Sequence, residues 1–175
     1  NNGFYTINFS LNARSGAITT LTSSGSQNLF LSTTLNPNLV PQNSSPQFLN
    51  PPIGNFCAGQ PATLSPNGFD VDGDAIVYSL INARQAATTS VTYAAGFSGT
   101  NPLTSSTGTT INPNTGVISF TPTVVGQVAI IAVKAEEYRN GVKIGEITRD
   151  IMVRIINCGA NTAPVISNVS NVVVP

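Results

Sequence analysis

Three of the chain's seven carboxylate side chains are crowded into one short segment. They are Asp70, Asp72 and Asp74, and no acidic residue precedes them in the sequence. Like charges at this spacing repel one another, so the cluster is favourable only where water, a cation or a basic partner offsets it. Hard cations such as Ca²⁺ take carboxylate oxygens as ligands. The alternative is a solvated turn in which Asp side chains accept hydrogen bonds from backbone amides. The residue types leave both interpretations open.

Neither an EF-hand nor a catalytic centre explains the acidic residues. In a loop that begins at Asp70, the sixth position is Ala75 in place of glycine, and the twelfth is Ile81 in place of glutamate. The chain contains no histidine, which excludes a Ser-His or Cys-His nucleophile. Glu136 and Glu137 are adjacent, so a strand directs them to opposite faces and not to one substrate bond. We therefore expect that the chain is not an enzyme.

The two cysteines, Cys57 and Cys158, bracket every charged residue except Arg14. A bridge between them would close a loop of about 100 residues, worth about 4.7 kcal/mol on the chain-entropy model. Two free, buried thiols are the alternative. We favour the disulfide because a β-sandwich can bring the first and last segments of a unit side by side. Two cysteines without histidine cannot supply the four ligands of a structural zinc site.

The composition is typical of an all-β protein with little charge. Only 8% of the residues are charged and the net charge is zero, so nothing in the sequence attracts nucleic acid or an anionic membrane. No apolar stretch approaches the roughly 20 residues that span a bilayer, and the first residues lack the regions of a signal peptide. Any targeting segment is therefore expected outside this sequence. Asn, Thr, Ser, Gly, Val and Ile favour strands and turns over helices.

Residues 1–45 are predicted to be the last strands of a preceding β-domain followed by a linker. Apolar and polar residues alternate over 4–11 with the period of a half-buried strand, and further strands are expected at 17–21 and 28–34. Three strands make a poor core by themselves, so the rest of that domain is expected outside this chain or in another one. The Pro-, Asn- and Ser-rich residues 36–46 are predicted to be a stiff, solvated linker.

Residues 46–158 are predicted to form one complete antiparallel β-sandwich. Interior strands are expected at 75–80, 90–94 and 117–120, and the longest pair is 127–137 with 142–157. The Asn140-Gly141 step between that pair is a strong hairpin signal. The last strand should have one apolar and one wet face. Cross-strand charge pairs are expected on the wet face, from Lys134, Glu137, Lys143, Glu146, Arg149, Asp150 and Arg154.

Residues 159–175 are predicted to be a linker and the first strand of a following repeat. The segment Asn161–Ile166 echoes Asn43–Phe48, since both are short polar stretches that end in proline and lead into apolar residues. The two lie about 118 residues apart, which suits one Ig-sized unit.

Taken together, these motifs resemble bacterial cadherin-like, Ig-fold repeats. The resemblance is carried by residues 69–80, 111–118 and 121–126. More narrowly, the chain is similar to large cell-surface adhesins associated with gliding motility in Bacteroidota. Segments of that pattern are Asn43–Phe48, Cys57–Pro61 and Glu136–Gly141, so the resemblance covers residues 43–158. One departure is at Asn12 and Ala13, where such proteins often carry two cysteines.

The resemblance implies an Ig-like or cadherin-like sandwich repeat flanked by partial neighbouring repeats, with calcium as its cofactor. Clustered acids in cadherin-like repeats help to bind Ca²⁺ near the junction between domains. Asp70 and Asp72 match those positions, Asp74 is an additional carboxylate, and Glu136 is expected as a further ligand. The linker around Asn43 is expected to contribute from the neighbouring unit.

The function implied is structural and adhesive. The chain would be a repeat segment of a long extracellular, cell-surface protein that extends and presents adhesive regions, in surface attachment or gliding motility. Its partners would be neighbouring repeats and a surface ligand of unidentified chemistry, with a glycan as one candidate. The alternative is a carbohydrate-binding or accessory module of a secreted enzyme, in which Tyr78, Tyr93 and Tyr138 would stack on a sugar.

Overall fold

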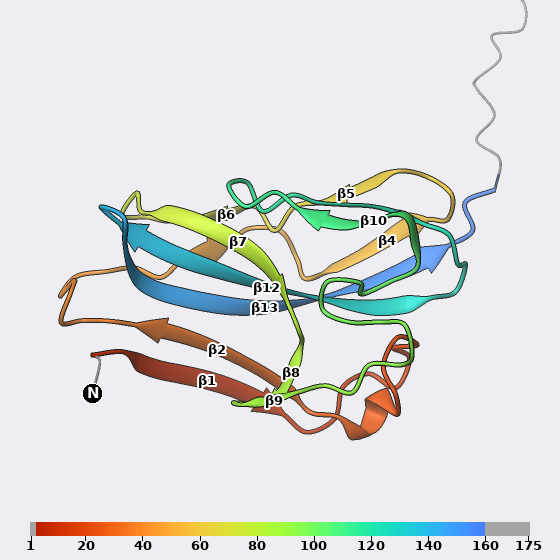
Figure 1. The fold of residues 1–175 in the computed structure, drawn as a ribbon, viewed down its shortest axis with the longest axis horizontal. Helices are drawn as coiled ribbons and strands as arrows, with labels where there is room; N and C mark the ends of the chain where they lie inside the picture. The colour runs from red at the N-terminus through yellow and green to blue at the C-terminus, as the bar shows by residue number, and fades with distance from the viewer. Residues whose placement is uncertain (1–2, 160–175) are drawn as a thin grey trace, which may run out of the picture.

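The computed structural model describes residues 3–159, which form strands and one short 3₁₀ helix, η1 (Ser24–Ser26) (Figure 1). No α-helix occurs within that range, and none of these residues forms a helix long and apolar enough to cross a membrane. The strands are β1 (Tyr5–Leu11), β2 (Leu29–Leu35), β3 (Gln47–Phe48), β4 (Ile53–Cys57), β5 (Ala62–Leu64), β6 (Gly68–Phe69), β7 (Ala75–Ile81), β8 (Arg84–Ala86), β9 (Thr89–Ser90), β10 (Ser105–Ile111), β11 (Ile118–Pro122), β12 (Val128–Arg139) and β13 (Val142–Ile156).

The largest sheet is built around β13, which is 15 residues long. Its strand order is β7-β12-β13-β2-β8-β9, with β1 added to β2 and β4 added to β13. The first part of β13 pairs antiparallel with β2, whereas its last part pairs parallel with β4. The predicted β12–β13 hairpin is confirmed. Asn140 and Gly141 both have positive φ, at 52° and 78°, which a two-residue hairpin turn of the favoured type requires.

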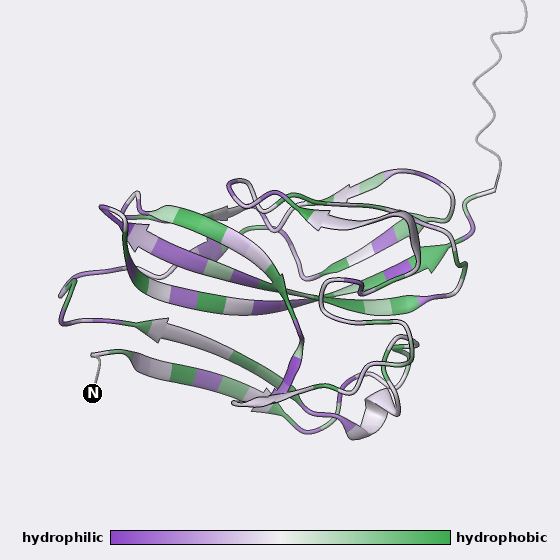
Figure 2. Cartoon of the chain, viewed as in Figure 1, coloured by the Kyte–Doolittle hydropathy of each residue, from purple (hydrophilic) through white to green (hydrophobic). Residues whose placement is uncertain are grey.

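A second layer covers one face of this sheet and completes a β-sandwich. It consists of the three-stranded sheet β10-β11-β5 and the small pair β3-β6. Between the layers lies a core in which Phe120 packs edge-on against Phe56 and in which Tyr78 and Ile118 are buried. The predicted all-β class and antiparallel sandwich are confirmed. Figure 2 shows hydrophobic and hydrophilic residues alternating along much of β13, as expected for a strand in such a layer.

The central strand β12 is buried on both faces over residues 128–133, an unbroken run of apolar residues. On its other face, Val128 and Ile130 pack with Ile18 and Leu21 from the segment between β1 and β2. That segment is irregular apart from η1 and a single bridge from Leu21 to Tyr93, so the strand predicted at 17–21 is wrong. The predicted strand at 90–94 is likewise mostly loop, with only β9 at its start.

The prediction that the face of the last strand carrying Asp150 is exposed to solvent is wrong. This carboxylate forms an ion pair with Arg14 at 2.5 Å, and the two side chains are only 10% and 3% exposed. The physical reason is the irregular segment after β1, which covers this face of the sheet. Burial raises the pKa of Asp150, and the nearby Arg14 opposes that rise.

How the chain divides into domains stays a prediction. Residues 1–45 and 46–158 nonetheless share one sheet, because β2 is hydrogen-bonded to β13. The predicted strand at 161–166 lies outside the described residues.

The predicted disulfide between Cys57 and Cys158 is confirmed, with 5.4 Å between the two Cα atoms. The parallel pairing of β4 with β13 places Cys57 beside Ile156, so the second cysteine arrives at the correct position just beyond the strand.

Candidate metal centre

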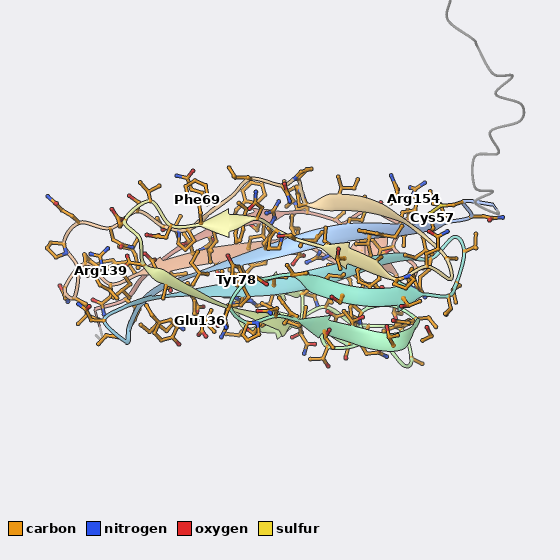
Figure 3. All side chains as sticks on the ribbon, turned by 90° about the horizontal axis from the view of Figure 1, so that it is seen from above. Cys57, Phe69, Tyr78, Glu136, Arg139 and Arg154 are labelled. Carbon is orange, nitrogen blue, oxygen red and sulfur yellow. A yellow bond between two sulfur atoms is a disulfide. The ribbon has the colours of Figure 1, made fainter. Side chains whose placement is uncertain are left out.

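The acidic residues gather at one end of the sandwich, around the turn between β6 and β7. This turn carries Asp70, Asp72 and Asp74, and the end of β12 lies beside it because β12 pairs with β7. The linker from β2 to β3 passes the same end, close to the β12–β13 hairpin (Figure 1). Figure 3 shows Arg139 at this end and Cys57 at the opposite one.

Asp70 supports the turn by capping its backbone. One carboxylate oxygen, Oδ1, accepts hydrogen bonds from the amides of Asp72 at 2.9 Å and Asp74 at 3.1 Å. Gly73 adopts a φ of 83°, a left-handed conformation that glycine tolerates without strain. The turn interpretation of the cluster is therefore confirmed for Asp70.

The other oxygen of Asp70 points to the cation interpretation. Oδ2 is buried and has no hydrogen-bond partner among the described residues. One oxygen each from Asp70, Asp74 and Glu137 lie within 4.8 Å of one another. A buried, unpaired carboxylate oxygen is costly, so a group of this kind favours a cation or a proton in its centre.

Glu137 reaches the cluster because the neighbouring strand makes room for it. It pairs with Gly145 of β13, and a Cβ atom on that glycine would lie 2.7 Å from Glu137 Oε2 and 2.9 Å from the carbonyl oxygen of Thr34. Glycine at this position thus leaves space for the carboxylate. The Glu137 side chain is consequently buried, with the residue only 1% exposed.

The structure does not bring Glu136, the expected ligand, to this group. Adjacent strand residues point to opposite faces, and Glu136 instead lies 2.9 Å from the Lys134 ammonium and 2.6 Å from that of Lys143. Burial raises the pKa of Glu136, but hydrogen bonds from the two lysines outweigh this effect and the pKa is lowered overall. Lys143 also forms an ion pair with Glu146 at 2.6 Å, but both residues lie on β13, so this is not one of the predicted cross-strand pairs.

A basic side chain already offsets part of the negative charge. The Arg139 guanidinium donates to both oxygens of Asp74, from Nε at 2.7 Å and from Nη2 at 2.5 Å. These hydrogen bonds hold the pKa of Asp74 below its usual value, although burial opposes them. Asp72 is farther away, with its Oδ2 3.9 Å from Arg139 Nη2.

The linker is tied to the cluster through three consecutive residues. Asn43 donates from Nδ2 to Glu137 Oε1 at 2.8 Å and accepts at Oδ1 from Arg139. The Ser44 amide donates to Asp72 Oδ2 at 2.5 Å, and the Gln42 carbonyl accepts from Arg139 at 3.3 Å. The linker near Asn43 thus contacts Asp72, Glu137 and Arg139 through hydrogen bonds, and a contribution from a neighbouring unit stays a prediction.

The surroundings of Glu137 disfavour its ionised form. Its pKa is raised to about 7, chiefly by burial and further by the charges of Asp70 and Asp74. A hydrogen bond shared with Asp74 acts in the same direction, whereas the hydrogen bond from Asn43 lowers the pKa. Near pH 7 the cluster therefore changes its charge easily.

The donor set fits a hard cation. Asp70, Asp74 and Glu137 offer carboxylate oxygens, which Ca²⁺ and Mg²⁺ prefer, and no nitrogen or sulfur ligand lies among them. Asp72 instead accepts a hydrogen bond from the Ser44 amide of the linker, and it does not belong to the group of three carboxylates. The sequence did not identify Glu137 as a candidate ligand. The signal that could have found it is Gly145, the small residue that pairs with Glu137, but this pairing follows only from the register of the β12–β13 hairpin.

The tyrosines proposed for sugar stacking do not form one surface. Tyr78 is buried in the core. Tyr93 packs against the apolar cluster that contains Ile18 and Leu21, and its hydroxyl accepts a hydrogen bond from the Ala83 amide at 3.0 Å. Tyr93 and Tyr138 are partly exposed, but Tyr138 pairs with Ala75 at the far end of β12, so the three rings do not lie together.

Comparisons with known proteins leave the family open. No protein-family model matches the chain, and no curated protein matches it. Among solved structures, it is similar to the insect immune protein hemolin, which is described as having a new domain arrangement with implications for homophilic adhesion. The two are 12% identical, and the match covers 88% of this chain and 39% of hemolin with a TM-score of 0.30. At that TM-score the likeness supports no statement about function.

Proposed function

We propose that this chain is a structural and adhesive segment of a long extracellular surface protein. Its role would be to extend and present adhesive regions as one stiff unit, in which residues 1–45 and 46–158 are held together by the shared sheet and by the linker between them. The observation that carries the proposal is the network in which Gln42, Asn43 and Ser44 of the linker bind Asp72, Glu137 and Arg139 of the sandwich.

The shape of the sandwich supports a role in extension. The chain enters β1 at the end where the linker lies and leaves β13 at the other end, where the disulfide lies (Figures 1 and 3). At about 3.3 Å per residue, the 15 residues of β13 connect these ends over roughly 50 Å. Hydrogen bonds to β12 along nearly the whole strand, together with the disulfide, resist a pull between the two ends.

We further propose that the acidic group holds calcium. Asp70, Asp74 and Glu137 would bind the ion, while Asn43 and Arg139 position the carboxylates around it. When bound, the cation would supply the positive charge that the buried Asp70 Oδ2 lacks. Glu137 gives up its proton as the ion binds, which makes the affinity depend on pH. The linker is then fixed more tightly, since both Asn43 and Ser44 bind carboxylates of the cluster.

Calcium titration of the full chain by calorimetry tests this site. Asp70→Asn is the informative variant, because the amide oxygen still caps the turn while the second carboxylate oxygen is lost. Glu137→Gln should also abolish binding, whereas Glu136→Gln, one residue away on the opposite face, should leave it unchanged. Equal heats for the wild type and Asp70→Asn, or loss of binding in Glu136→Gln alone, would contradict the assignment.

Placement outside the cell is supported by the disulfide, because such bridges persist in oxidising compartments. The resemblance to gliding-motility adhesins supports a function in surface attachment. An antibody raised against the chain should label intact source cells and reduce their attachment to a surface. Labelling that requires cell lysis would exclude this placement.

A further inference from the structure

The β1–β2 end of the large sheet carries an apolar surface that no described element covers. The side chains of Tyr5, Ile7, Phe9 and Leu11 are all exposed, between 49% and 61%. They alternate with polar residues along β1, as Figure 2 shows, and therefore point to one side of the sheet. With Leu31 of β2 they form what we name the β1–β2 apolar face. Exposed apolar residues of this number on one strand mark an interaction site.

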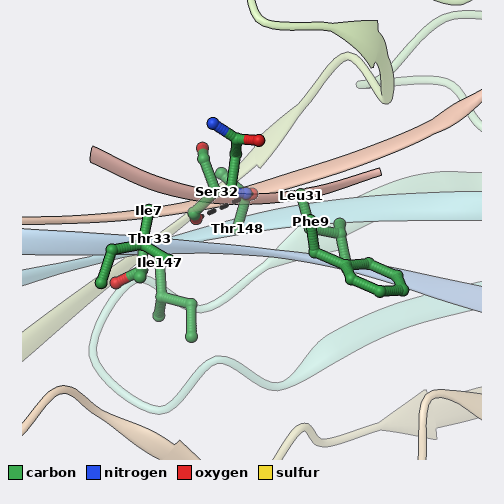
Figure 4. Close-up of a pocket in the computed structure, with 8 residues that line it drawn as sticks. Ile7, Phe9, Leu31, Ser32, Thr33, Ile147 and Thr148 are labelled. Atoms are coloured by element: carbon green, nitrogen blue, oxygen red, sulfur yellow. Dashed lines mark hydrogen bonds between the residues drawn. The ribbon is translucent and has the colours of Figure 1, made fainter. Parts of the chain in front are cut away.

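This face continues the face that forms the main core. Phe9 pairs with Leu31, Ile7 pairs with Thr33, and Thr33 pairs in turn with Ile147 of β13. Ile147 itself packs against the buried core. Figure 4 shows Phe9 and Leu31 side by side, on the same side of the sheet as Ile147. The second layer thus ends above β13, and within residues 3–159 no facing layer lies over β1 and β2.

We propose that a second copy of this chain supplies that layer, by stacking its own β1–β2 apolar face on this one. Identical faces meet in a twofold-symmetric dimer, so each face must tolerate a copy of itself. The five residues of the face carry no charge, and their apolar side chains can pack against one another without repulsion. A face of charged residues would exclude this arrangement.

The alternation along β1 defines how two copies fit. A twofold axis beside Asn8 places Tyr5 against the partner's Leu11 and Ile7 against the partner's Phe9. Each contact then joins an aromatic and an aliphatic side chain, which interdigitate better than two of equal size. Two sheets stacked in this way lie about 10 Å apart, as in other β-sandwiches.

The size of the face predicts a weak dimer. Half-exposed aromatic and aliphatic side chains in this number present roughly 500 Å² per copy, so the dimer buries about 1,000 Å² in total. That is near the lower limit for specific interfaces, and it favours a dissociation constant in the range of about 1–100 µM.

Sedimentation of the full chain over a range of concentrations tests the proposal. The wild type should show a monomer–dimer equilibrium, and Phe9→Lys should raise the dissociation constant at least tenfold. Val125→Lys is the matched control, because Val125 is 55% exposed and Phe9 is 54% exposed. It should dimerise like the wild type. Both variants replace exposed side chains, so unchanged melting temperatures are expected and confirm that they fold.

A mixing experiment tests the twofold arrangement itself. Ile7→Lys and Phe9→Asp should each dimerise poorly alone, but their equimolar mixture should associate, since the new charges face each other across the axis. A monomeric wild type, or a dimer that Phe9→Lys leaves intact, would overturn the proposal. A monomer whose residues 5–11 are protected from hydroxyl-radical labelling would do so too, and would indicate that residues 160–175 cover the face instead.

Discussion

Glu137 is the residue on which the chemistry of the acidic group depends. It is buried among carboxylates, accepts a hydrogen bond from the linker, and has a pKa of about 7. Its neighbour Glu136 has the same side chain but faces two lysines, and its pKa is lowered. Two adjacent residues of β12 thus have opposite pKa shifts. Burial makes Glu137 harder to ionise, whereas the two lysines keep Glu136 ionised.

The raised pKa of Glu137 predicts that the folded protein loses stability as the pH rises. Between the unfolded value of 4.5 and the folded value of about 7, the folded state binds more protons than the unfolded state. The contribution is complete below pH 4.5 and is lost as the pH passes 7, with a loss of at most about 3 kcal/mol. Denaturant unfolding at a series of pH values measures this change.

Glu137→Gln should remove that dependence, because the amide does not titrate and still accepts a hydrogen bond from Asn43. Glu136→Gln, which alters the opposite face, should retain it. A wild-type stability that stays flat or rises between pH 5 and pH 8 would show that Glu137 is ionised throughout.

Arg14 forms a buried ion pair with Asp150. Arg14→Met should lower the free energy of unfolding by about 3–5 kcal/mol, because it leaves a buried carboxylate without its partner. Adding Asp150→Leu should restore most of the loss, since an apolar pair of similar volume needs no hydrogen bonds. A double variant as unstable as the single one would mean that Arg14 acts through its other bonds, to the Asn28 and Arg84 carbonyls.

Among the strands, β13 organises the fold because three different neighbours pair along it. β12 follows it antiparallel along most of its length, β2 joins its first part, and β4 joins its last part in parallel. Parallel neighbours need a long connection, and here residues 58–141 provide it. The disulfide closes the far end of this arrangement.

Removal of the disulfide should therefore weaken the β4–β13 end in particular. A Cys57→Ala and Cys158→Ala double variant should lose about 2–5 kcal/mol of unfolding free energy. Hydrogen exchange should increase most at residues 53–57 of β4. Chemical reduction of the wild type should reproduce the change, and equal loss of protection over the whole sheet would instead indicate global unfolding.

For the whole molecule, the sequence predicted the fold class well because the signals concerned are local. Alternation over 75–80 and the Asn140-Gly141 turn depend on neighbouring residues, and both elements are present. The disulfide followed from the sandwich, which brings the two segments together.

Features that depend on contacts between residues far apart in the sequence could not be predicted from local patterns. The segment 17–21 resembles a strand but packs as an irregular cover, because Ile18 and Leu21 gain burial on β12. Asp150 looked exposed by alternation, since the layer above it comes from residues far away in sequence. For the site, the three Asp residues were evident, but the choice between Glu136 and Glu137 required the strand pairing.

Hydrogen exchange at the Ser44 amide, with and without calcium, tests most directly whether the acidic group fixes the linker. This amide donates to Asp72 in the turn that Asp70 caps. We predict protection of Ser44 in the wild type that increases at least tenfold when calcium is added at pH 8, and no increase in Asp70→Asn. Exchange at the rate of an unstructured peptide, unchanged by calcium, would contradict a fixed linker.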